Sequence, residues 1–391
     1  MTMTLTSSAL QPFGTTIFAE MSALATAHQA INLGQGFPDF EGPESIKEAA
    51  IEALRHGSNQ YARSQGHGPL VEAVSRKVER HYGIRRDPYT EVGVYSGATE
   101  ALAAAVFGLV ERGDEVVVFE PVYDSYLPLL SLVGAAPKVA SLRWPDFAVD
   151  REAVAALFSD KTKLLLLNTP HNPTGKVFSR EDLLFLADLC ERHGVYVVCD
   201  EVYEHLTFGC EHVPMATLPG FEDRVLTISS TGKTFSMTGW KIGYAHGSAK
   251  LIAAAQSAHQ FLTFATATPL QQAMASALDL PASFYATFRA EYADRRSALL
   301  TALEQAGLPT WSPQGTYFVL SHIGHLGFAS DRAFARYLTQ EIGVACIPVS
   351  PFYPSGRRED GELARFAFCK ELRTIQAAAE RLKTLASGVT A

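Results

Sequence analysis

The sequence predicts an α/β protein in which helices cover both faces of a mostly parallel β-sheet, joined to a smaller α+β unit. Two observations carry this prediction. Short apolar segments alternate with helix-like segments between about residues 90 and 230. The alternation stops after Pro281, where a long polar helical pattern begins. Strands that alternate with helices at this spacing pair in parallel, because each helix carries the chain back across the sheet.

The individual elements follow from the pattern of apolar residues. One helix is expected over 179–193, since Ser179 can cap its first turn, apolar residues share one face, and Gly194 can end it. The buried strands of the sheet are expected at 92–95, 115–119, 163–167, 195–199 and 225–228. Beyond residue 281 we expect a helix over 283–307, strands over 315–321 and 363–369, and helices from Asp331 and Thr374.

The chain of 391 residues is long enough for a large domain and a smaller one. Its first forty-odd residues carry little charge and end in a glycine- and proline-containing loop, residues 32–40. We expect residues 46–282 to form the large α/β domain. Residues 1–45 and 283–391 are expected to form the small α+β domain together, because the two ends of a chain often lie near one another.

The composition argues against several classes of function. With 41 acidic and 33 basic residues the formal net charge is −8, which gives no basic surface for nucleic acid. The longest apolar run, residues 101–110, is about half of what a membrane span requires. No lysine or arginine precedes Lys47, so neither a signal peptide nor a transit peptide is expected. The five cysteines form no Cys-x-x-Cys pair, which favours reduced thiols and a cytoplasmic protein.

Residues with reactive or hydrogen-bonding side chains follow the expected strands one after another. Ligands of α/β sheets bind at the carboxyl ends of the strands, so these residues are expected to meet. After the five strands come, in turn, the segment Ser96–Glu100 that opens a helix, Tyr123, Asn172, the segment Asp200–Tyr203, and Lys233. Each feature alone is common in structural positions, and it is their succession that indicates a site.

This set matches the needs of pyridoxal phosphate chemistry. Lys233 lies among hydroxyl side chains and glycines, and is the expected lysine for imine formation with the cofactor and for proton transfer. Asp200 is expected to pair with the pyridine nitrogen, so that the ring can accept electrons. Asn172 and Tyr203 are expected to hydrogen-bond the phenolic oxygen of the ring, and Tyr123 to stack on its face.

The remaining expected contacts concern charged groups at the two ends of the site. Arg365 is the candidate for the substrate carboxylate, because a guanidinium group binds a carboxylate through two parallel hydrogen bonds. A turn of small residues at a helix start, with hydroxyl and ammonium groups nearby, can hold the phosphate. The expected phosphate ligands are Gly97, Ala98, Thr99, Ser230 and Lys241.

Two other sequence patterns suggest a binding site but fit known motifs poorly. The tripeptide Gly232–Thr234 suggests a nucleotide phosphate loop, but that motif needs a glycine five residues before Gly232, where Thr227 stands. His205, Cys210 and His212 have a spacing that fits no common zinc site, so no metal is expected.

The chain resembles the class I/II aminotransferases, which are pyridoxal phosphate enzymes of fold type I, over nearly its whole length. The motifs that carry the resemblance are Asn168–Gly175, Asp200–Tyr203, Ser230–Lys233 and Gly239–Gly243. Residues 33–40, 60–67 and 259–264 are similar to the branch that holds kynurenine aminotransferases, glutamine transaminase K and bacterial methionine aminotransferases. The resemblance implies a large domain of three layers, αβα, and a smaller α+β domain.

The resemblance also implies a homodimer whose two active sites are shared between the subunits. By position, Tyr61 would reach the cofactor phosphate of the neighbouring subunit, and Phe264 would enter the neighbour's substrate pocket. Gly36 would offer its backbone N–H to the substrate carboxylate. Phe18 stands where this branch places an aromatic ring against the substrate side chain.

The function that follows is a pyridoxal phosphate-dependent aminotransferase, which moves the α-amino group of a neutral amino acid to a 2-oxo acid by a ping-pong mechanism. The chain offers Arg365 for the α-carboxylate and no obvious second arginine for an acidic side chain. An acidic side chain among aromatic rings would lack a partner, so methionine, aromatic residues, glutamine and kynurenine are the expected donors. The candidate pocket residues are Phe18, Phe37, Tyr123 and Phe264.

Three alternatives stay open on this sequence. A β-lyase acting on cysteine conjugates shares every motif with an aminotransferase. An N-succinyl-diaminopimelate aminotransferase has similar motifs and would take an acylated diamino acid. A non-enzymatic regulator that binds pyridoxal phosphate is the least favoured, because such regulators carry an added DNA-binding domain and few residues precede Phe13.

Overall fold

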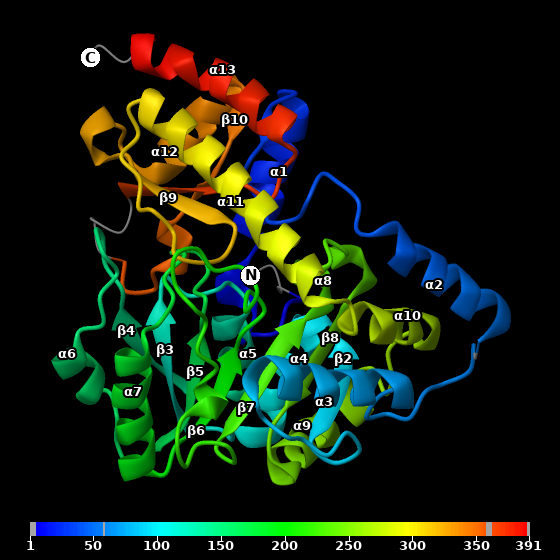
Figure 1. Ribbon diagram of the computed structural model, residues 1–391. Coiled ribbons are helices and arrows are strands. Elements are labelled where there is room, and N and C mark those ends of the chain that lie inside the picture. Colours follow the sequence, from blue (N-terminus) through cyan, green and yellow to red (C-terminus); the bar gives the residue numbers. More distant parts are fainter. Residues whose placement is uncertain (1–4, 58, 357–361, 389–391) are drawn as a thin grey trace.

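The computed structural model describes residues 5–57, 59–356 and 362–388 of the chain. Figure 1 shows a large sheet with flanking helices in the lower part of the molecule and a smaller group of helices and strands above it. The helices are α1 Ile17–Ala27, α2 Glu44–His56, α3 Gly68–Tyr82, α4 Gly97–Leu109, α5 Tyr126–Val133, α6 Arg151–Ala155, α7 Arg180–His193, α8 Thr231–Thr234, α9 Ala249–Leu262, α10 Thr268–Leu278, α11 Ala282–Gln305, α12 Asp331–Tyr337 and α13 Leu372–Gly388. The strands are β1 Ile31–Asn32, β2 Val92–Ser96, β3 Glu115–Glu120, β4 Ala136–Ser141, β5 Thr162–Asn168, β6 Tyr196–Asp200, β7 Val225–Ser230, β8 Ile242–His246, β9 Phe318–His322, β10 Val344–Ala345, β11 Ile347–Pro348 and β12 Leu363–Ala367.

The large sheet has seven strands in the order β2-β8-β7-β6-β5-β3-β4. β8 runs antiparallel to both of its neighbours, β2 and β7. The other pairs in the sheet are parallel. The carboxyl ends of six strands therefore lie at the same edge as the amino end of β8, and this edge carries the site described below.

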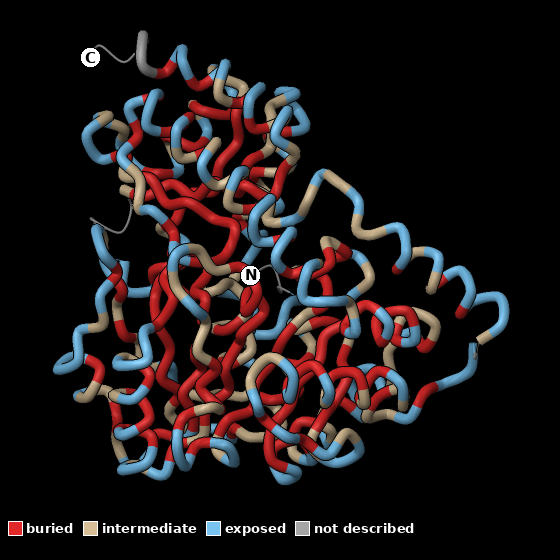
Figure 2. Tube along the Cα trace, in the orientation of Figure 1, coloured by how far each residue is buried: buried red, intermediate tan, exposed pale blue. Residues whose placement is uncertain are grey.

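Alternate residues of each strand pack on opposite faces, because side chains alternate along a strand. On β5, Leu164 and Leu166 belong to a core with α4, α5 and α9, whereas Leu165 and Leu167 belong to a core with α3 and α7. Figure 2 shows the strands of the sheet buried and the outward faces of the covering helices exposed. The predicted α/β class with helices on both faces of a mostly parallel sheet is confirmed.

All five strands predicted for the large sheet are present. Two further strands of this sheet, β4 and β8, were not predicted. β4 contains Pro137, which lacks the N–H that a central strand donates, and β4 is accordingly at the edge of the sheet. β8 contains Gly243 and is separated from the lysine-bearing helix α8 only by a short 3-10 helix, Thr238–Trp240. The predicted helix over 179–193 is α7, in which the Ser179 hydroxyl accepts a hydrogen bond from Asp182 N and Gly194 adopts a left-handed conformation.

The smaller part joins segments from both ends of the chain. β9, β11 and β12 form an antiparallel sheet, and β1 pairs in parallel with β10. Figure 1 shows α1 and α13, which are far apart in sequence, together in the upper part. The predicted helices and strands beyond residue 281 are α11, β9, α12, β12 and α13. Domain boundaries at residues 45/46 and 282/283 stay a prediction.

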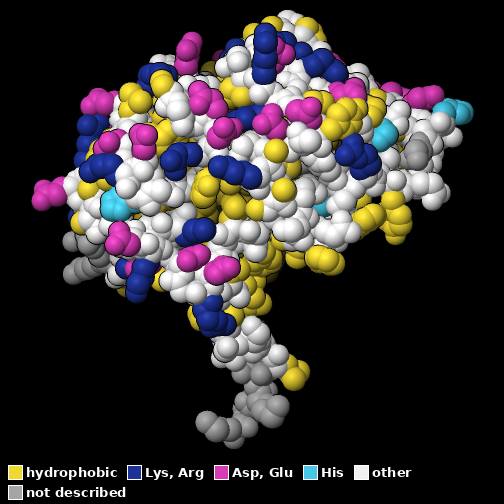
Figure 3. Space-filling view, turned by 90° about the horizontal axis from the view of Figure 1, so that it is seen from below, with side chains coloured by type: hydrophobic (Ala, Val, Ile, Leu, Met, Phe, Trp, Pro, Cys, Tyr) yellow, Lys and Arg dark blue, Asp and Glu magenta, His cyan; other side chains and the backbone are white. Residues whose placement is uncertain are grey.

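None of the helices in the described ranges is both long and apolar enough to cross a bilayer. Figure 3 shows basic and acidic side chains intermingled over one face, without an extended patch of one charge.

Candidate active site

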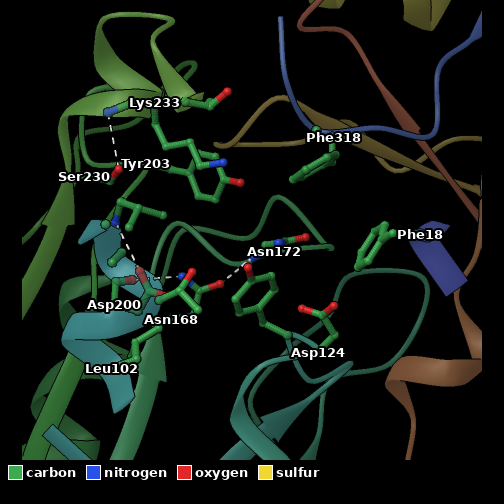
Figure 4. Close-up of a pocket in the computed structure, with 18 of the residues that line it drawn as sticks. Phe18, Leu102, Asp124, Asn168, Asn172, Asp200, Tyr203, Ser230, Lys233 and Phe318 are labelled. Carbon is green, nitrogen blue, oxygen red and sulfur yellow. Dashed lines mark hydrogen bonds between the residues drawn. The ribbon is translucent and has the colours of Figure 1, made fainter. Parts of the chain in front are cut away.

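A pocket opens at the carboxyl edge of the large sheet, where the smaller part covers it. It encloses about 980 Å³, including open solvent at its mouth. Figure 4 shows its side chains arriving from several strand ends and from the segments above them. The predicted site residues that line it are Phe18, Gly36, Gly97, Ala98, Thr99, Tyr123, Asn172, Asp200, Tyr203, Ser230, Lys233, Lys241 and Arg365.

Lys233 is placed by a tight turn between β7 and the short helix α8. The Ser230 hydroxyl accepts from Gly232 N at 3.3 Å, which caps α8. A Cβ atom at Gly232 would lie 2.9 Å from Thr238 Cα, so this close turn requires glycine. Burial lowers the pKa of the Lys233 amine to about 8. A larger share of the amine is therefore neutral, and able to act as a nucleophile, than for a lysine in water.

Asp200, the last residue of β6, lies at the base of the pocket and is 4% exposed. Its carboxylate accepts from the Tyr126 hydroxyl at 2.7 Å and from Val202 N at 3.4 Å. Burial raises the pKa of Asp200 to about 6, although both hydrogen bonds and the nearby Lys233 act in the opposite direction. A cationic ligand group at this position would restore the charged form, because it would offset the cost of burial.

Another group of pocket residues is suited to hold an anion. β2 ends at the start of α4, a helix of 13 residues, whose first N–H groups are free of intrahelical partners. Lys241 lies immediately before β8, and its Nζ would be 3.0 Å from a Cβ atom at Gly97. Because β8 is antiparallel, its first residues lie beside the carboxyl end of β2. The free amides and the ammonium group thus lie together.

Asn172 connects the base of the pocket to Arg365. Asn168 Nδ2 donates to the backbone oxygen of Asp200 at 2.9 Å, and Asn168 Oδ1 accepts from Asn172 N at 2.7 Å. Asn172 Oδ1 in turn accepts from Arg365 Nη1 at 3.1 Å. Since the oxygen is engaged by the guanidinium, the amide nitrogen of Asn172 is the part that can donate to a ligand.

Arg365 is 2% exposed, on β12 of the smaller part. Its Nη2 donates to the backbone oxygen of Gly34 at 2.9 Å, while Nε has no hydrogen-bond partner in the described part of the chain. The guanidinium carbon lies 4.0 Å from the ring centre of Phe318 and 4.9 Å from that of Phe18. Burial lowers the pKa of Arg365 to about 10, so it stays charged at neutral pH. A buried cation with an unused donor is suited to a carboxylate ligand.

Three aromatic residues from the sequence analysis do not line the pocket. Tyr61 is 85% exposed and Phe264 is 38% exposed, and their rings meet edge to face with centres 5.4 Å apart. Phe37 is 49% exposed, with Lys370 Nζ 4.9 Å from its ring centre. The roles expected of Tyr61 and Phe264 in a neighbouring subunit stay predictions.

Sequence reasoning missed several residues of the pocket. Asp124 follows Tyr123 directly, so a search of the two residues after each strand-end candidate would have found it. Phe318 and Gln35 gave no such signal, because β9 and the segment before residue 40 reach the pocket only through tertiary packing. The pocket residues that were not predicted are Gln35, Leu102, Asp124, Asn168, Val202, Gly232, Thr238 and Phe318.

Pyridoxal phosphate fits this pocket. It carries a phosphate at one end, which suits the start of α4 and Lys241, and a basic ring nitrogen, which suits the buried carboxylate of Asp200. Its aldehyde requires an amine that is partly neutral, and Lys233 supplies one. Fold and pocket together define a pyridoxal phosphate enzyme of fold type I.

The chain belongs to the aminotransferase class I and II family, whose model matches residues 28–382. It is similar over 98% of its length, with 42% identity, to the probable N-succinyldiaminopimelate aminotransferase of Mycobacterium tuberculosis, of which it covers 99%. It is also 40% identical to a kynurenine–oxoglutarate transaminase of Dictyostelium discoideum, over 95% of this chain and 94% of the relative. The solved methionine aminotransferase of Escherichia coli superposes with a TM-score of 0.94 at 42% identity, over 98% of this chain and 100% of the other. The protein is thus a pyridoxal phosphate-dependent aminotransferase, which acts on an amino acid and a 2-oxo acid.

Proposed function

We propose that the preferred amino donor has a neutral side chain, such as methionine, an aromatic amino acid, glutamine or kynurenine. The observation that carries this proposal is the placement of positive charge. Of the described residues that line the pocket, the lysines and arginines are Lys233, Lys241 and Arg365. Lys233 and Lys241 lie toward the cofactor, and Arg365 is needed for the α-carboxylate. An acidic side chain would therefore be desolvated without a cation.

Bound pyridoxal phosphate supplies an electron sink for the bond that breaks at the donor's Cα. In our proposal Lys233 attaches the cofactor and then carries the proton away from Cα. Asp200 holds a proton on the ring nitrogen, which keeps the ring electron-poor. Asn172 and Tyr203 would donate hydrogen bonds to the ring oxygen, and Tyr123 would contact the ring.

The substrate is held by groups from the smaller part. Arg365 binds the α-carboxylate, and the backbone N–H of Gly36 adds a second donor. Phe18 contacts the donor's side chain. Because Arg365 also donates to Asn172, the carboxylate site and the ring-oxygen site are linked by one hydrogen bond of 3.1 Å.

The assignment of Lys233 is tested by covalent trapping. Wild-type protein loaded with pyridoxal phosphate and reduced with borohydride should carry the adduct on the peptide that contains Lys233, as measured by mass spectrometry. Lys233→Ala should lose this adduct, whereas Lys250→Ala, a change at a lysine of α9 outside the pocket, should keep it. An unchanged adduct in Lys233→Ala would overturn the assignment.

A panel of donors tests the neutral-donor proposal. Single-turnover rates with methionine, phenylalanine, glutamine, kynurenine and aspartate should give a kcat/KM for the best neutral donor at least tenfold above that for aspartate. The order among neutral donors is left to the measurement, because an apolar pocket separates similar side chains by about 1–3 kcal/mol. Preference for aspartate over methionine and phenylalanine by tenfold would contradict the proposal.

A second candidate donor is N-succinyl-diaminopimelate, favoured by the 42% identity to the probable N-succinyldiaminopimelate aminotransferase named above. It belongs in the same panel, and a tenfold lead over methionine and phenylalanine would select it. β-Elimination from a cysteine conjugate is distinguished there by release of pyruvate.

We also propose a homodimer with shared active sites, in which Tyr61 contacts the cofactor phosphate bound to the neighbouring subunit and Phe264 contacts its substrate. The two exposed rings support this assignment because they are in contact, with centres 5.4 Å apart, and contiguous exposed apolar surface marks interaction sites. A cytoplasmic location stays a prediction.

A further inference from the structure

One acidic residue of the pocket has no role in the chemistry proposed above. Asp124 lies in the turn between β3 and α5, directly after Tyr123, and lines the pocket. Figure 4 shows Asp124 and Phe18 toward the same end of the pocket, away from Lys233, with the carboxylate of Asp124 facing the open space. Among the described residues, the carboxylate of Asp124 has hydrogen bonds from Ser125 and a longer-range interaction with the charge of Arg365.

The charge of Asp124 is balanced at a distance by Arg365. Burial raises the pKa of Asp124, and the positive charge of Arg365 is the largest influence that lowers it again. Asp124 in turn favours the charged form of Arg365. Arg365 already donates to Asn172 and to Gly34, so Asp124 acts on it through space and forms no close ion pair with it.

A bound donor changes this balance. Its α-carboxylate takes up the charge of Arg365, so the carboxyl group of Asp124 then faces the donor's side chain without a cation of its own, while hydrogen bonds from Ser125 favour its charged form. A side-chain carboxylate at that place meets like charge at low dielectric, whereas an N–H group meets a strong acceptor. Phe18, at the same end, offers the apolar part of the side chain a contact surface.

We propose that Asp124 determines specificity for the amino donor: it rejects donors with an anionic side chain and favours those whose side chain ends in an N–H donor, such as a carboxamide or an aryl amine. This inference rests on the proposed function, because it takes the end of the pocket near Phe18 and Arg365 as the donor side-chain site.

Glutamine and glutamate test the proposal, because they have nearly the same shape and differ in charge. In single-turnover assays of the holoenzyme, the ratio of kcat/KM for glutamine to that for glutamate should fall at least tenfold in Asp124→Asn. Asp124→Glu, which keeps the charge, should preserve a preference for glutamine. Asp146→Asn removes the same charge outside this pocket and should leave the ratio within twofold of wild type. Because each result is a ratio within one variant, a common loss of rate does not affect it.

Binding without turnover gives an independent measurement. Calorimetry of the holoenzyme with glutarate and with its monoamide, glutaramate, should show tighter binding of the monoamide in wild type and a ratio of Kd values at least tenfold smaller in Asp124→Asn. Ratios that stay within twofold of wild type in both experiments would overturn the role of Asp124. Failure of the proposed function has a different signature, namely a wild-type enzyme that prefers aspartate to methionine in the donor panel.

Discussion

At the scale of single residues, the pocket combines groups whose ionisation is shifted in opposite directions. Burial lowers the pKa of Lys233 to about 8 and raises that of Asp200 to about 6. Both shifts arise because the site removes charged groups from water. The two shifted pKa values are the basis of two predictions, one on the stability of the cofactor-free protein and one on cofactor uptake.

The first prediction concerns Asp200 in the cofactor-free protein. A rise from the ordinary pKa of 3.8 to about 6 corresponds to about 3 kcal/mol of lost stability when the group is charged in both states. The folded protein binds the proton more tightly, so this penalty is absent below pH 4 and complete above pH 6. Asp200→Asn should therefore unfold at higher urea than wild type at pH 7, and the difference should disappear near pH 4.

The same variant should transaminate on the order of 10³-fold more slowly, because the cofactor's ring nitrogen loses its anionic partner. Asp146→Asn is the control for a surface carboxylate and should show neither effect. A stability gain that does not depend on pH, or a rate within a few-fold of wild type, would contradict the role of Asp200.

The second prediction concerns cofactor uptake. Only neutral Lys233 can attack an aldehyde, so the rate of covalent attachment of pyridoxal phosphate should rise about tenfold per pH unit up to about pH 8 and then level off. Borohydride trapping at timed intervals measures this rate. Pyridoxine phosphate has no aldehyde, and its binding, measured by calorimetry, should lack this profile. A covalent rate that is flat between pH 6 and 8 would contradict the lowered pKa.

At the scale of elements, the direction of β8 brings Lys241 to the pocket. A parallel strand at this place in the sheet would begin at the opposite edge. The antiparallel β8 instead starts beside α4, and its Gly243 lies against the first turn of that helix. A Cβ atom at Gly243 would be 2.5 Å from Ala98 N and 2.5 Å from Gly97 C.

The third prediction follows from this close packing. Gly243→Ala should displace β8 from α4 and disturb the expected phosphate site, because a backbone neighbour cannot give way as a flexible side chain can. We expect the Kd for pyridoxal phosphate to rise at least tenfold, with a lower midpoint of thermal unfolding. Gly239→Ala is the matched control, since a Cβ atom there has no neighbour within 4 Å. Equal cofactor affinities in the two variants would refute the explanation.

At the scale of the whole molecule, the pocket is divided between the two parts of the fold. Lys233 and Asp200 come from α8 and β6 of the large part, whereas Arg365 and Phe18 come from β12 and α1. The N-terminal segment is held there by the pairing of β1 with β10 and by the Tyr317 hydroxyl, which donates to Gly36 O at 2.5 Å. The expected site for the substrate carboxylate thus comes from the smaller part, and the hydrogen bond from Arg365 to Asn172 joins it to the large part.

The fourth prediction concerns the assembly. Phe261 is 89% exposed and lies three residues before Phe264, the residue expected at a subunit interface. Phe261→Asp should weaken the homodimer, so sedimentation velocity should show more monomer and activity should fall on dilution. Leu184→Asp on α7, at a leucine that is 45% exposed, is the control and should keep the wild-type assembly. A fully active wild-type monomer at assay concentration would contradict the shared site.

Local patterns along the chain were enough to predict the α/β class, the five strands rich in apolar residues, and the residues that follow them. A strand buried on both faces needs a continuous apolar run, and the carboxyl ends of parallel strands converge at one edge of the sheet. For the same reason Lys233, Asp200 and Asn172 could be identified from the amino-acid sequence.

Tertiary packing, in contrast, selects the distant segments that complete the pocket. The insertion of β8 in the antiparallel direction, the edge position of β4, and the arrival of Phe318 at Arg365 all depend on contacts between residues far apart in the chain. Tertiary packing also decides which aromatic side chains are exposed. Phe18 lines the pocket, whereas Tyr61 and Phe37 lie outside it, although all three are aromatic. Burial also sets the pKa values, because desolvation depends on what surrounds a side chain and not on its neighbours in sequence.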